Sequence, residues 1–413
     1  MTIFVGVDWA EAHHDVCVKD NSGGTLAKRR VLDGIAGVRQ FHELVAPFIE
    51  EPAEALVGIE TDRGLFVGAL VAVGYRVYAV NPFSSSRYRD RHSSSGAKSD
   101  PGDAEVLADL VRTDAQHHRQ VAGDTDLAEA VKILARGHQS MIWTRGRQTN
   151  TLRSTLREFY PNALVVFGED LDADEALEIL IMAPTPALGR QLSRSKIQAG
   201  LRRAGRQRRL DERAFEIQEA LRREELEAPP VISEAFGSSV AASARVLVEL
   251  NRQIEALETA MAERFEQHPD SKIVRSLPGL GTVLGARVLG EFGDDPERYA
   301  SAKSRKNYAG TSPITRASGT KRVVLARFAR NRRIADATYL WAFSALTKSP
   351  GARALYDRHR AAGDSHHQAL RALANRLVGI LHGCLVTQTL YDEEIAWEPP
   401  RPRPLDGLRA WDV

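Results

Sequence analysis

Cysteine and long apolar segments are both scarce in this chain of 413 residues. The two cysteines, Cys17 and Cys384, lie far apart and without a CxxC spacing, so we expect neither a disulfide framework nor a cysteine-rich zinc site. Such usage fits a reducing cytoplasm. No apolar run reaches the ~18–20 residues that span a bilayer, and the N-terminus shows neither the basic start nor the cleavage site of a signal peptide. We therefore expect no membrane partner.

Several catalytic signatures are also missing. The glycine-rich phosphate loops of actin-like ATPases do not occur, which argues against a sugar kinase or a chaperone ATPase. No His/Asp partner set stands at hydrolase spacing. The adjacent histidine pairs at 13–14, 117–118 and 366–367 are more typical of surface or helix-end positions than of metal ligands. The apolar run Tyr339–Phe343 is expected in the core.

The distribution of charge says more than its sum, which is +2. Residues 298–333 hold eleven Lys and Arg and no acid, and residues 132–157 hold six basic residues and no acid. A third block, residues 190–213, holds nine basic residues and two acids. Because charges of both signs are usually mixed on a solvated surface, these blocks predict surfaces that bind a polyanion.

The first part of the chain has the pattern of an α/β domain. Alternating or short apolar segments predict strands at residues 2–8, 15–19, 27–32, 56–60 and 76–80. Helical spacing predicts helices at 35–48, at 64–73 and from about residue 100, and we expect a polar loop at 84–99. A meander of three strands followed by helix, strand, helix, strand and helix is the order of an RNase H-like mixed sheet flanked by helices.

The remainder of the chain is expected to be mainly helical. We expect no further strand between residues 104 and 270, and long helices at 128–159 and 197–265, the latter a helical hairpin or coiled coil broken at Pro229-Pro230. Glycine and proline return from Asp270 onward, which indicates a separate compact domain. The expected segments are an α/β domain at 1–165, a helical segment at 166–267, a C-terminal domain at 268–395 and a Pro-rich tail at 396–413.

Four acids stand out in the α/β domain. Asp8 and Glu60 each end an apolar strand, and Asp100 and Asp103 share one face of a helix's first turn. Four carboxylates at one sheet edge would repel one another without a cation. Mg²⁺ or Mn²⁺ would neutralise them and could hold a phosphodiester.

Other interpretations of these acids remain open. Asp100 and Asp103 could simply cap a helix and complement its dipole. Asp15 and Asp62 are rival acids close to the two strands.

A serine within the basic block at 298–333 is a candidate nucleophile. Ser318 precedes Gly319 and lies close to Arg316, Lys321 and Arg322, and a hydroxyl that attacks a phosphate needs nearby cations and little steric bulk. Attack on a phosphodiester would store the bond as a phosphoserine.

The same segment has other interpretations. A phosphate-binding Ser/Thr loop is equally compatible with it, and Thr311 and Ser312 are rival hydroxyls. Upstream, residues 272–286 resemble a helix–hairpin–helix element, in which a Pro-Gly-x-Gly turn offers backbone N–H groups to a DNA phosphate.

Taken together, these motifs closely resemble the DEDD-type insertion-sequence transposases of the IS110 family, the bridge-RNA-guided serine recombinases. The resemblance runs over nearly the whole chain. The segments that carry it are Gly6–Ala10, Ile59–Gly64, Val80–Pro82, Arg87–Arg91, Lys98–Ala104, Ser276–Leu280, Ala309–Gly310 and Pro313–Gly319.

The resemblance implies a RuvC-like N-terminal domain with Asp8, Glu60, Asp100 and Asp103 as its tetrad, a coiled-coil dimerisation segment, and a transposase domain with Ser318 as its nucleophile. It further implies a composite site, a 5′-phosphoserine and a Holliday-junction intermediate. Its expected partners are donor and target double-stranded DNA, a structured guide RNA, and further copies of the chain in a dimer or tetramer, in the cytoplasm at the bacterial nucleoid. The residues expected to contact nucleic acid are basic: Arg87, Arg89, Arg91, Lys98, Arg305, Lys306, Arg316, Lys321, Arg322 and Arg327.

Two other functions compete with this interpretation. A RuvC-like junction resolvase or nuclease would use the acids and metal-activated water, and would leave Ser318 without a task. A non-catalytic nucleic-acid-binding scaffold would need the acids only for its structure.

Overall fold

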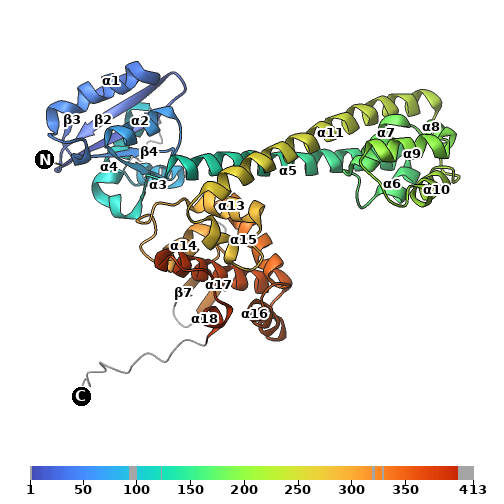
Figure 1. Cartoon of the computed structure of the whole chain (residues 1–413). Coiled ribbons are helices and arrows are strands. Elements are labelled where there is room, and N and C mark those ends of the chain that lie inside the picture. The colour runs from blue at the N-terminus through green and yellow to red at the C-terminus, as the bar shows by residue number, and fades with distance from the viewer. Residues whose placement is uncertain (1, 93–99, 122, 319–320, 328–329, 399–413) are drawn as a thin grey trace. The chain divides into compact units, whose positions relative to one another are not determined.

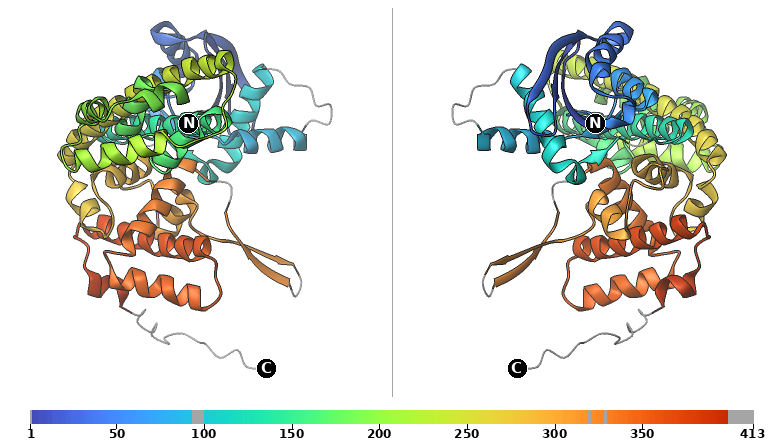
Figure 2. Two further views of the ribbon diagram at one scale, coloured as in Figure 1. Left: turned by 90° about the vertical axis from the view of Figure 1, so that its right-hand side faces the viewer. Right: turned by 90° about the vertical axis from the view of Figure 1, so that its left-hand side faces the viewer.

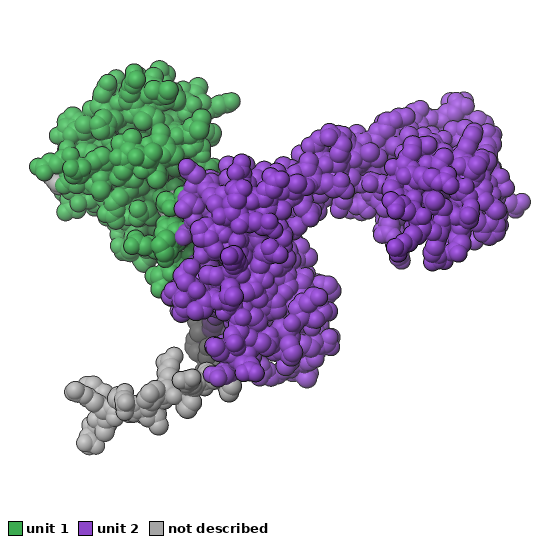
Figure 3. All heavy atoms as spheres, in the orientation of Figure 1, with its two compact units in different colours: residues 1–124, 295–300 green, residues 125–294, 301–413 purple. Residues whose placement is uncertain are grey.

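The computed structural model describes the chain except residues 1, 93–99, 122, 319–320, 328–329 and 399–413. The chain folds into two compact units, one of residues 1–124 with 295–300 and one of residues 125–294 with 301–413 (Figure 3). The two units are defined by which residues pack together, so the four functional segments expected from the sequence remain predictions.

The first unit is built on a mixed six-stranded sheet in the order β3-β2-β1-β4-β5-β6 (Figure 1). The three strands β1, β4 and β5 run parallel, and β2, β3 and β6 pair antiparallel with their neighbours. The strands are β1 Ile3–Trp9, β2 His13–Lys19, β3 Thr25–Leu32, β4 Ala55–Ile59, β5 Arg76–Ala79 and β6 Arg119–Gln120.

Helices cover both faces of this sheet. They are α1 Gly34–Val45, α2 Leu65–Val73, α3 Pro82–His92 and α4 Asp100–Asp114. Odd-numbered β1 residues such as Val5 pack in one core with Phe41 of α1 and Phe66 of α2. Phe4 packs on the opposite face, in a second core with Leu107 of α4. This alternation also assigns the even-numbered residues of β1 to the α4 face.

Two expectations for this unit are wrong. Residues 84–92 of the expected polar loop belong to helix α3, which begins at Pro82. Asn81 Oδ1 accepts a hydrogen bond from the Phe83 N–H at 2.9 Å at the start of this helix. Residues 93–99 lie outside the described part. The second difference is strand β6, which has two residues and therefore no periodicity that a sequence pattern could reveal.

The second unit contains two long helices that pack antiparallel, α5 Asp126–Phe159 and α11 Pro230–Gln267 (Figure 1). Arg145 Nη1 donates to Asn251 Oδ1 at 3.1 Å, and Phe159 stacks on Phe236 with ring centroids 4.9 Å apart. The expected interruption at Pro229-Pro230 is confirmed. The expectation that residues 197–265 pair with one another in a hairpin or coiled coil is not confirmed, because α11 packs along α5, which precedes this range in the chain.

Shorter helices complete the second unit. One group shares a core with the distal halves of α5 and α11, and consists of α6 Pro161–Phe167, α7 Asp174–Met182, α8 Pro186–Gln191, α9 Arg194–Arg203 and α10 Leu210–Leu221. The other group is α12 Ser271–Ser276, α13 Thr282–Phe292, α14 Ala302–Ala309, α15 Arg332–Ala345, α16 Pro350–Ala361, α17 His366–Thr387 and α18 Glu393–Trp397. The mainly helical character expected after residue 268 is confirmed.

Two features of the second group bear on function. The hairpin of β7 Ile314–Ser318 and β8 Lys321–Leu325 projects away from the surrounding helices (Figure 2). Helices α12 and α13 flank the turn at residues 277–281, where Gly279 has a φ of +83°. A Cβ on Gly279 would lie 2.7 Å from the Ala345 backbone nitrogen, so only glycine fits this turn.

Helices α11 and α17 are long and apolar enough, by length and composition, to cross a membrane. Core helices of soluble proteins meet the same criteria. Here α11 packs along α5, and α17 contacts α14, α15 and α16.

Candidate carboxylate and serine sites

Asp8 and Glu60 lie at the same edge of the sheet, at the ends of neighbouring parallel strands. Val7 pairs with Ile59 in the register of β1 and β4, so each acid is the next residue after a paired position. Both follow the alternation that places Gly6 and Gly58 under α4. Strand pairing therefore brings two carboxylates together from positions 52 residues apart in the sequence.

Helix α4 lies directly on these two strands. A Cβ on Gly6 would stand 1.8 Å from the Ala104 carbonyl oxygen, and one on Gly58 would stand 2.6 Å from that of Leu107. Lys19, which pairs with Phe4, donates to Asp109 at 2.5 Å, so α4 runs antiparallel to β1. Its first turn, with Asp100 and Asp103, is therefore at the edge where β1 and β4 end.

Helix α3 supplies partners to two of the four acids. Asp103 is 6% exposed, and Arg89 Nη2 lies 2.5 Å from its Oδ1. The Ser85 hydroxyl donates to Glu60. The guanidinium of Arg89 thus supplies positive charge to a buried carboxylate, which is the electrostatic task of a metal ion at such a site. The contact of Arg89 with nucleic acid remains a prediction.

The described side chains do not by themselves complete a metal site. Among them, no group of three or more His, Cys, Asp or Glu is placed to hold an ion. The side chain of Asp100 lies outside the described set. The donors nevertheless fit a hard divalent cation, because Asp8, Glu60 and Asp103 offer carboxylate oxygens at one sheet edge.

The rival acid Asp15 has a structural partner. It lies directly opposite Asp8 in the β1–β2 register, but Arg30 binds it through two nitrogens, Nε at 3.2 Å and Nη2 at 2.8 Å. Asp62 follows Glu60 by two residues and is outside β4.

Ser318 is the last residue of β7 and is exposed to solvent. It pairs with Lys321 across the hairpin, and Ala317 pairs with Arg322. The structure holds this segment in a two-stranded ribbon rather than in the Ser/Thr loop of the alternative interpretation. The side chains of Arg316, Lys321 and Arg322 lie outside the described set.

The rival hydroxyls differ in their surroundings. Thr311 Oγ1 lies 3.3 Å from both the Lys306 carbonyl oxygen and Asn375 Oδ1, so helices α14 and α17 hold it. Ser312 is partly exposed, and its carbonyl oxygen accepts a hydrogen bond from Arg327 Nε at 3.4 Å.

The remaining basic candidates are placed as follows. Arg87 and Arg91 are exposed on α3, and the Arg87 guanidinium lies 4.3 Å from the centroid of the Phe83 ring. Arg305 is buried, with its guanidinium 5.2 Å from the Phe292 ring centroid. Burial lowers the pKa of Lys306, which packs along α17. Lys98 lies outside the described residues.

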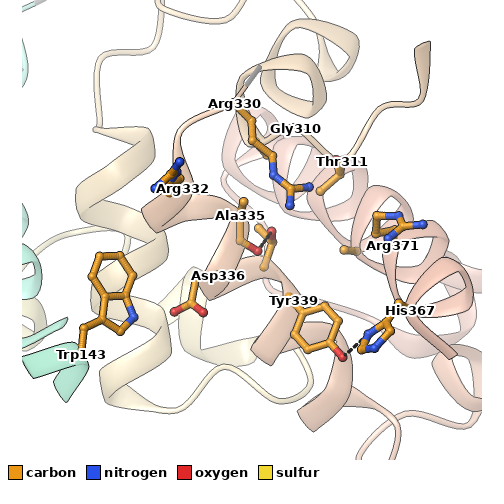
Figure 4. Close-up of a pocket in the computed structure, with 13 residues that line it drawn as sticks. Trp143, Gly310, Thr311, Arg330, Arg332, Ala335, Asp336, Tyr339, His367 and Arg371 are labelled. Atoms are coloured by element: carbon orange, nitrogen blue, oxygen red, sulfur yellow. Dashed lines mark hydrogen bonds between the residues drawn. The ribbon is translucent and has the colours of Figure 1, made fainter. Parts of the chain in front are cut away.

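Sequence patterns missed one further cluster. A cavity of about 620 Å³ in the second unit is lined by Trp143, Tyr339 and three arginines, Arg330, Arg332 and Arg371 (Figure 4). Of the run Tyr339–Phe343 that was expected in the core, Trp341 and Ala342 are buried, whereas Leu340 and Phe343 are exposed and Tyr339 lines the cavity. Only the basic character of residues 298–333 could have indicated this site.

Comparisons with known proteins agree with this layout. A family model described as a transposase matches residues 5–161, and one described as a transposase of the IS116/IS110/IS902 family matches residues 271–357. A Streptomyces coelicolor protein named as the mini-circle transposase for IS117 is 45% identical over 403 residues, 97% of each chain. A protein of insertion element IS110 from the same organism is 29% identical over 95% of this chain and 96% of its own length. A protein of IS900 from Mycobacterium paratuberculosis is 27% identical over 94% and 97%. The chain belongs to the IS110 family of transposases.

Proposed function

We propose that this transposase cuts and rejoins DNA with a metal-bound carboxylate tetrad in an RNase H-like domain and a serine nucleophile, Ser318. The observation that carries the proposal is the convergence of Asp8 and Glu60 at paired strand ends beneath the first turn of α4. The strand order β3-β2-β1-β4-β5, with β2 antiparallel to β1, is compatible with the RNase H-like layout.

Asp8, Glu60, Asp100 and Asp103 would hold Mg²⁺ or Mn²⁺. Such an ion, when bound, stabilises the charge that develops on the phosphate oxygens. Release of Asp103 from Arg89 would accompany loading of the site, because both cations compete for one carboxylate.

The serine step conserves the number of phosphoester bonds. Ser318 Oγ forms a bond to phosphorus and loses its proton, while the bond from phosphorus to the 3′ oxygen breaks and that oxygen takes up a proton. The product is a 5′-phosphoserine and a free 3′ hydroxyl. Reversal with a second 3′ hydroxyl rejoins strands without ATP. The exposed position of Ser318 on a projecting ribbon supports this role.

The proposed partners are those that the resemblance to the family implies. Donor and target duplexes are the substrates, a structured RNA pairs with both, and two or four copies of the chain act together in the cytoplasm. The exposed Arg87 and Arg91, with Lys306, Arg316, Lys321, Arg322 and Arg327, would contact the nucleic-acid backbone. Arg305 is proposed to act from its buried position, by supporting α14 against Phe292.

The test is to trap the covalent intermediate. Full-length protein reacts with end-labelled DNA carrying the element's ends, with RNA transcribed from the element, and is then denatured. We expect a protein–DNA adduct whose labelled peptide contains Ser318, and its loss in Ser318→Ala. Ser312→Ala is the matched control and should keep the adduct.

The same assay separates the alternatives. Strand cleavage that persists without an adduct in Ser318→Ala favours the resolvase or nuclease. Unchanged cleavage and rejoining in Asp8→Asn and Glu60→Gln favours a scaffold whose acids are structural. Under the proposal, each of these two variants loses several kcal/mol of transition-state stabilisation, about 10³-fold in rate or more.

A further inference from the structure

The cavity in the second unit is lined from several distant segments of the chain (Figure 4). Trp143 comes from α5, Gly310 and Thr311 from the turn after α14, Tyr339 from α15, and Arg371 from α17. These helices also contact one another, since α13 joins α5 to α15 and α17 packs on α14 and α15. The cavity is therefore a product of the packed domain rather than of one surface loop.

Positive charge outnumbers negative charge in the lining of this cavity. No carboxylate among the residues that the structure describes lies within ion-pair distance of Arg330, Arg332 or Arg371. The one acid in the lining, Asp336, accepts a hydrogen bond from Gln139 Nε2 at 2.8 Å and lies 4.0 Å from Arg287 Nη1. Three guanidinium groups around one hollow repel one another, and an anion bound between them would relieve this cost.

Two aromatic rings in the lining are held in place. The Arg333 guanidinium lies 5.0 Å from the Trp143 ring centroid, and Arg333 is itself anchored by the Arg136 carbonyl oxygen at 3.0 Å. The Tyr339 hydroxyl is 2.8 Å from His367 Nδ1. Fixed aromatic faces are the platforms on which proteins stack unpaired bases.

A second cavity of about 600 Å³ shares Gly310, Thr311 and Arg371 with the first. It adds three more cations, Lys306, Arg327 and Arg376. Gly310 has a φ of +71°, and a Cβ there would meet the Arg330 side chain at 2.5 Å. Glycine thus lets Arg330 lie across the turn at which the two cavities meet.

We propose that the first cavity binds an unpaired nucleotide of a nucleic-acid strand, with its base against Trp143 or Tyr339 and its phosphate among Arg330, Arg332 and Arg371. The neighbouring basic cavity would take the next phosphates of the same strand. A base within a duplex has both faces covered by its neighbours, so this site selects an unpaired or flipped nucleotide. The inference rests on the proposed function in one respect, namely that the protein handles nucleic acid.

Photocrosslinking tests the contact directly in the full-length chain. Oligonucleotides of 12 residues with 5-iodouracil at one position, as DNA, as RNA and as blunt duplex DNA, are irradiated with the protein, and crosslinked peptides are mapped. We expect crosslinks at Trp143 or Tyr339 with single strands and far fewer with the duplex. The DNA and RNA arms show which strand occupies the site. Crosslinks confined to peptides outside the cavity, or equal duplex crosslinking at Trp143, would overturn the proposal.

Affinity measurements supply the second readout. Loss of a stacked base corresponds to a roughly 5- to 150-fold weaker single-strand affinity, and we expect this range for Trp143→Ala by fluorescence anisotropy, with recovery in Trp143→Phe. Arg330→Gln and Arg371→Gln should each reduce the salt dependence of binding. The matched controls are Phe215→Ala and Arg264→Gln, exposed residues outside both cavities that should bind normally.

The outcome is separable from that of the strand-exchange proposal. Ser318→Ala should retain the Trp143 crosslink even when the covalent adduct is lost. If Ser318→Ala instead remained active, the crosslink would still report on the cavity. Unchanged single-strand affinity in folded Trp143→Ala, checked by circular dichroism, would refute the stacking site, whatever the nucleophile proves to be.

Discussion

Gly6 sets the distance between β1 and α4, and replacing it with alanine should disturb both the fold and the site. The added Cβ would lie 1.8 Å from the Ala104 carbonyl oxygen and 2.5 Å from the Ala108 nitrogen. Real Cβ atoms stay beyond about 3.0 Å from such atoms, so α4 would have to retreat by about 1 Å. Both contacts are backbone, so no side chain can rotate away.

The expected cost has two parts. Overpacking of this kind costs about 1–3 kcal/mol of unfolding free energy. The retreat of α4 also carries Asp103 away from the strand ends, and a displacement of about 1 Å in a catalytic group lowers rates by roughly 10²-fold. We therefore expect Gly6→Ala to lose activity even at temperatures at which it remains folded.

Urea unfolding and strand cleavage are measured on the same preparations. Gly68→Ala is the matched control, since it lies in α2 of the same unit with no atom within 4 Å of the new Cβ. Helix propensity predicts that this variant gains up to about 1 kcal/mol. Wild-type stability and cleavage in Gly6→Ala would contradict the close packing of α4 on β1.

Three further outcomes are expected. Burial and Arg287 lower the pKa of His138 to about 4, so the free energy of unfolding should fall as pH drops from about 6.5 towards 4, by up to about 1.4 kcal/mol per pH unit. His138→Gln should flatten this slope in urea titrations. Arg136 binds the buried carboxylate of Glu291 through Nε at 2.6 Å and Nη2 at 2.9 Å, so Arg136→Met should lower the free energy of unfolding by about 3–5 kcal/mol. A double variant with Glu291→Leu should recover most of this loss, whereas an equal loss in the single and double variants would argue against a buried unpaired charge. Removal of divalent cations with EDTA should abolish cleavage, with Mg²⁺ or Mn²⁺ restoring it, and cleavage that persists in EDTA would exclude a metal-dependent tetrad.

The sheet of the first unit was largely predictable. The central strands β1 and β4 are apolar enough to be buried on both faces, and Asp8 and Glu60 interrupt that pattern at their ends. Helix α3 was missed because its serines and arginines lack an apolar stripe, and Tyr88 is the one of its described side chains that joins the core beside α4. Strand β6 is too short to carry a pattern.

Contacts between distant residues could not be predicted in the same way. Nothing in the sequence around Arg89 distinguishes an arginine that binds Asp103 from one that faces DNA. Likewise, the pairing of α11 with α5 depends on which of several amphipathic faces meet, as at Phe159 and Phe236. The arginine-lined cavity combines Trp143 with residues near 330 and 371, and periodicity carries no information about such a meeting.

The pairing of α5 with α11 has a consequence for how this family can vary. Thr125, just before α5, donates to Asp294 through its N–H at 2.9 Å and its hydroxyl at 2.5 Å, and His268, just after α11, lies 3.1 Å from Asp294 through its Nε2. The start of α5 and the end of α11 are therefore held at one place. Equal insertions of seven residues in both helices would move the distal helical group outward by about 10 Å while keeping the facing side chains in phase. An insertion in one helix alone would break that phase. Length changes in α5 and α11 should therefore occur in matched pairs.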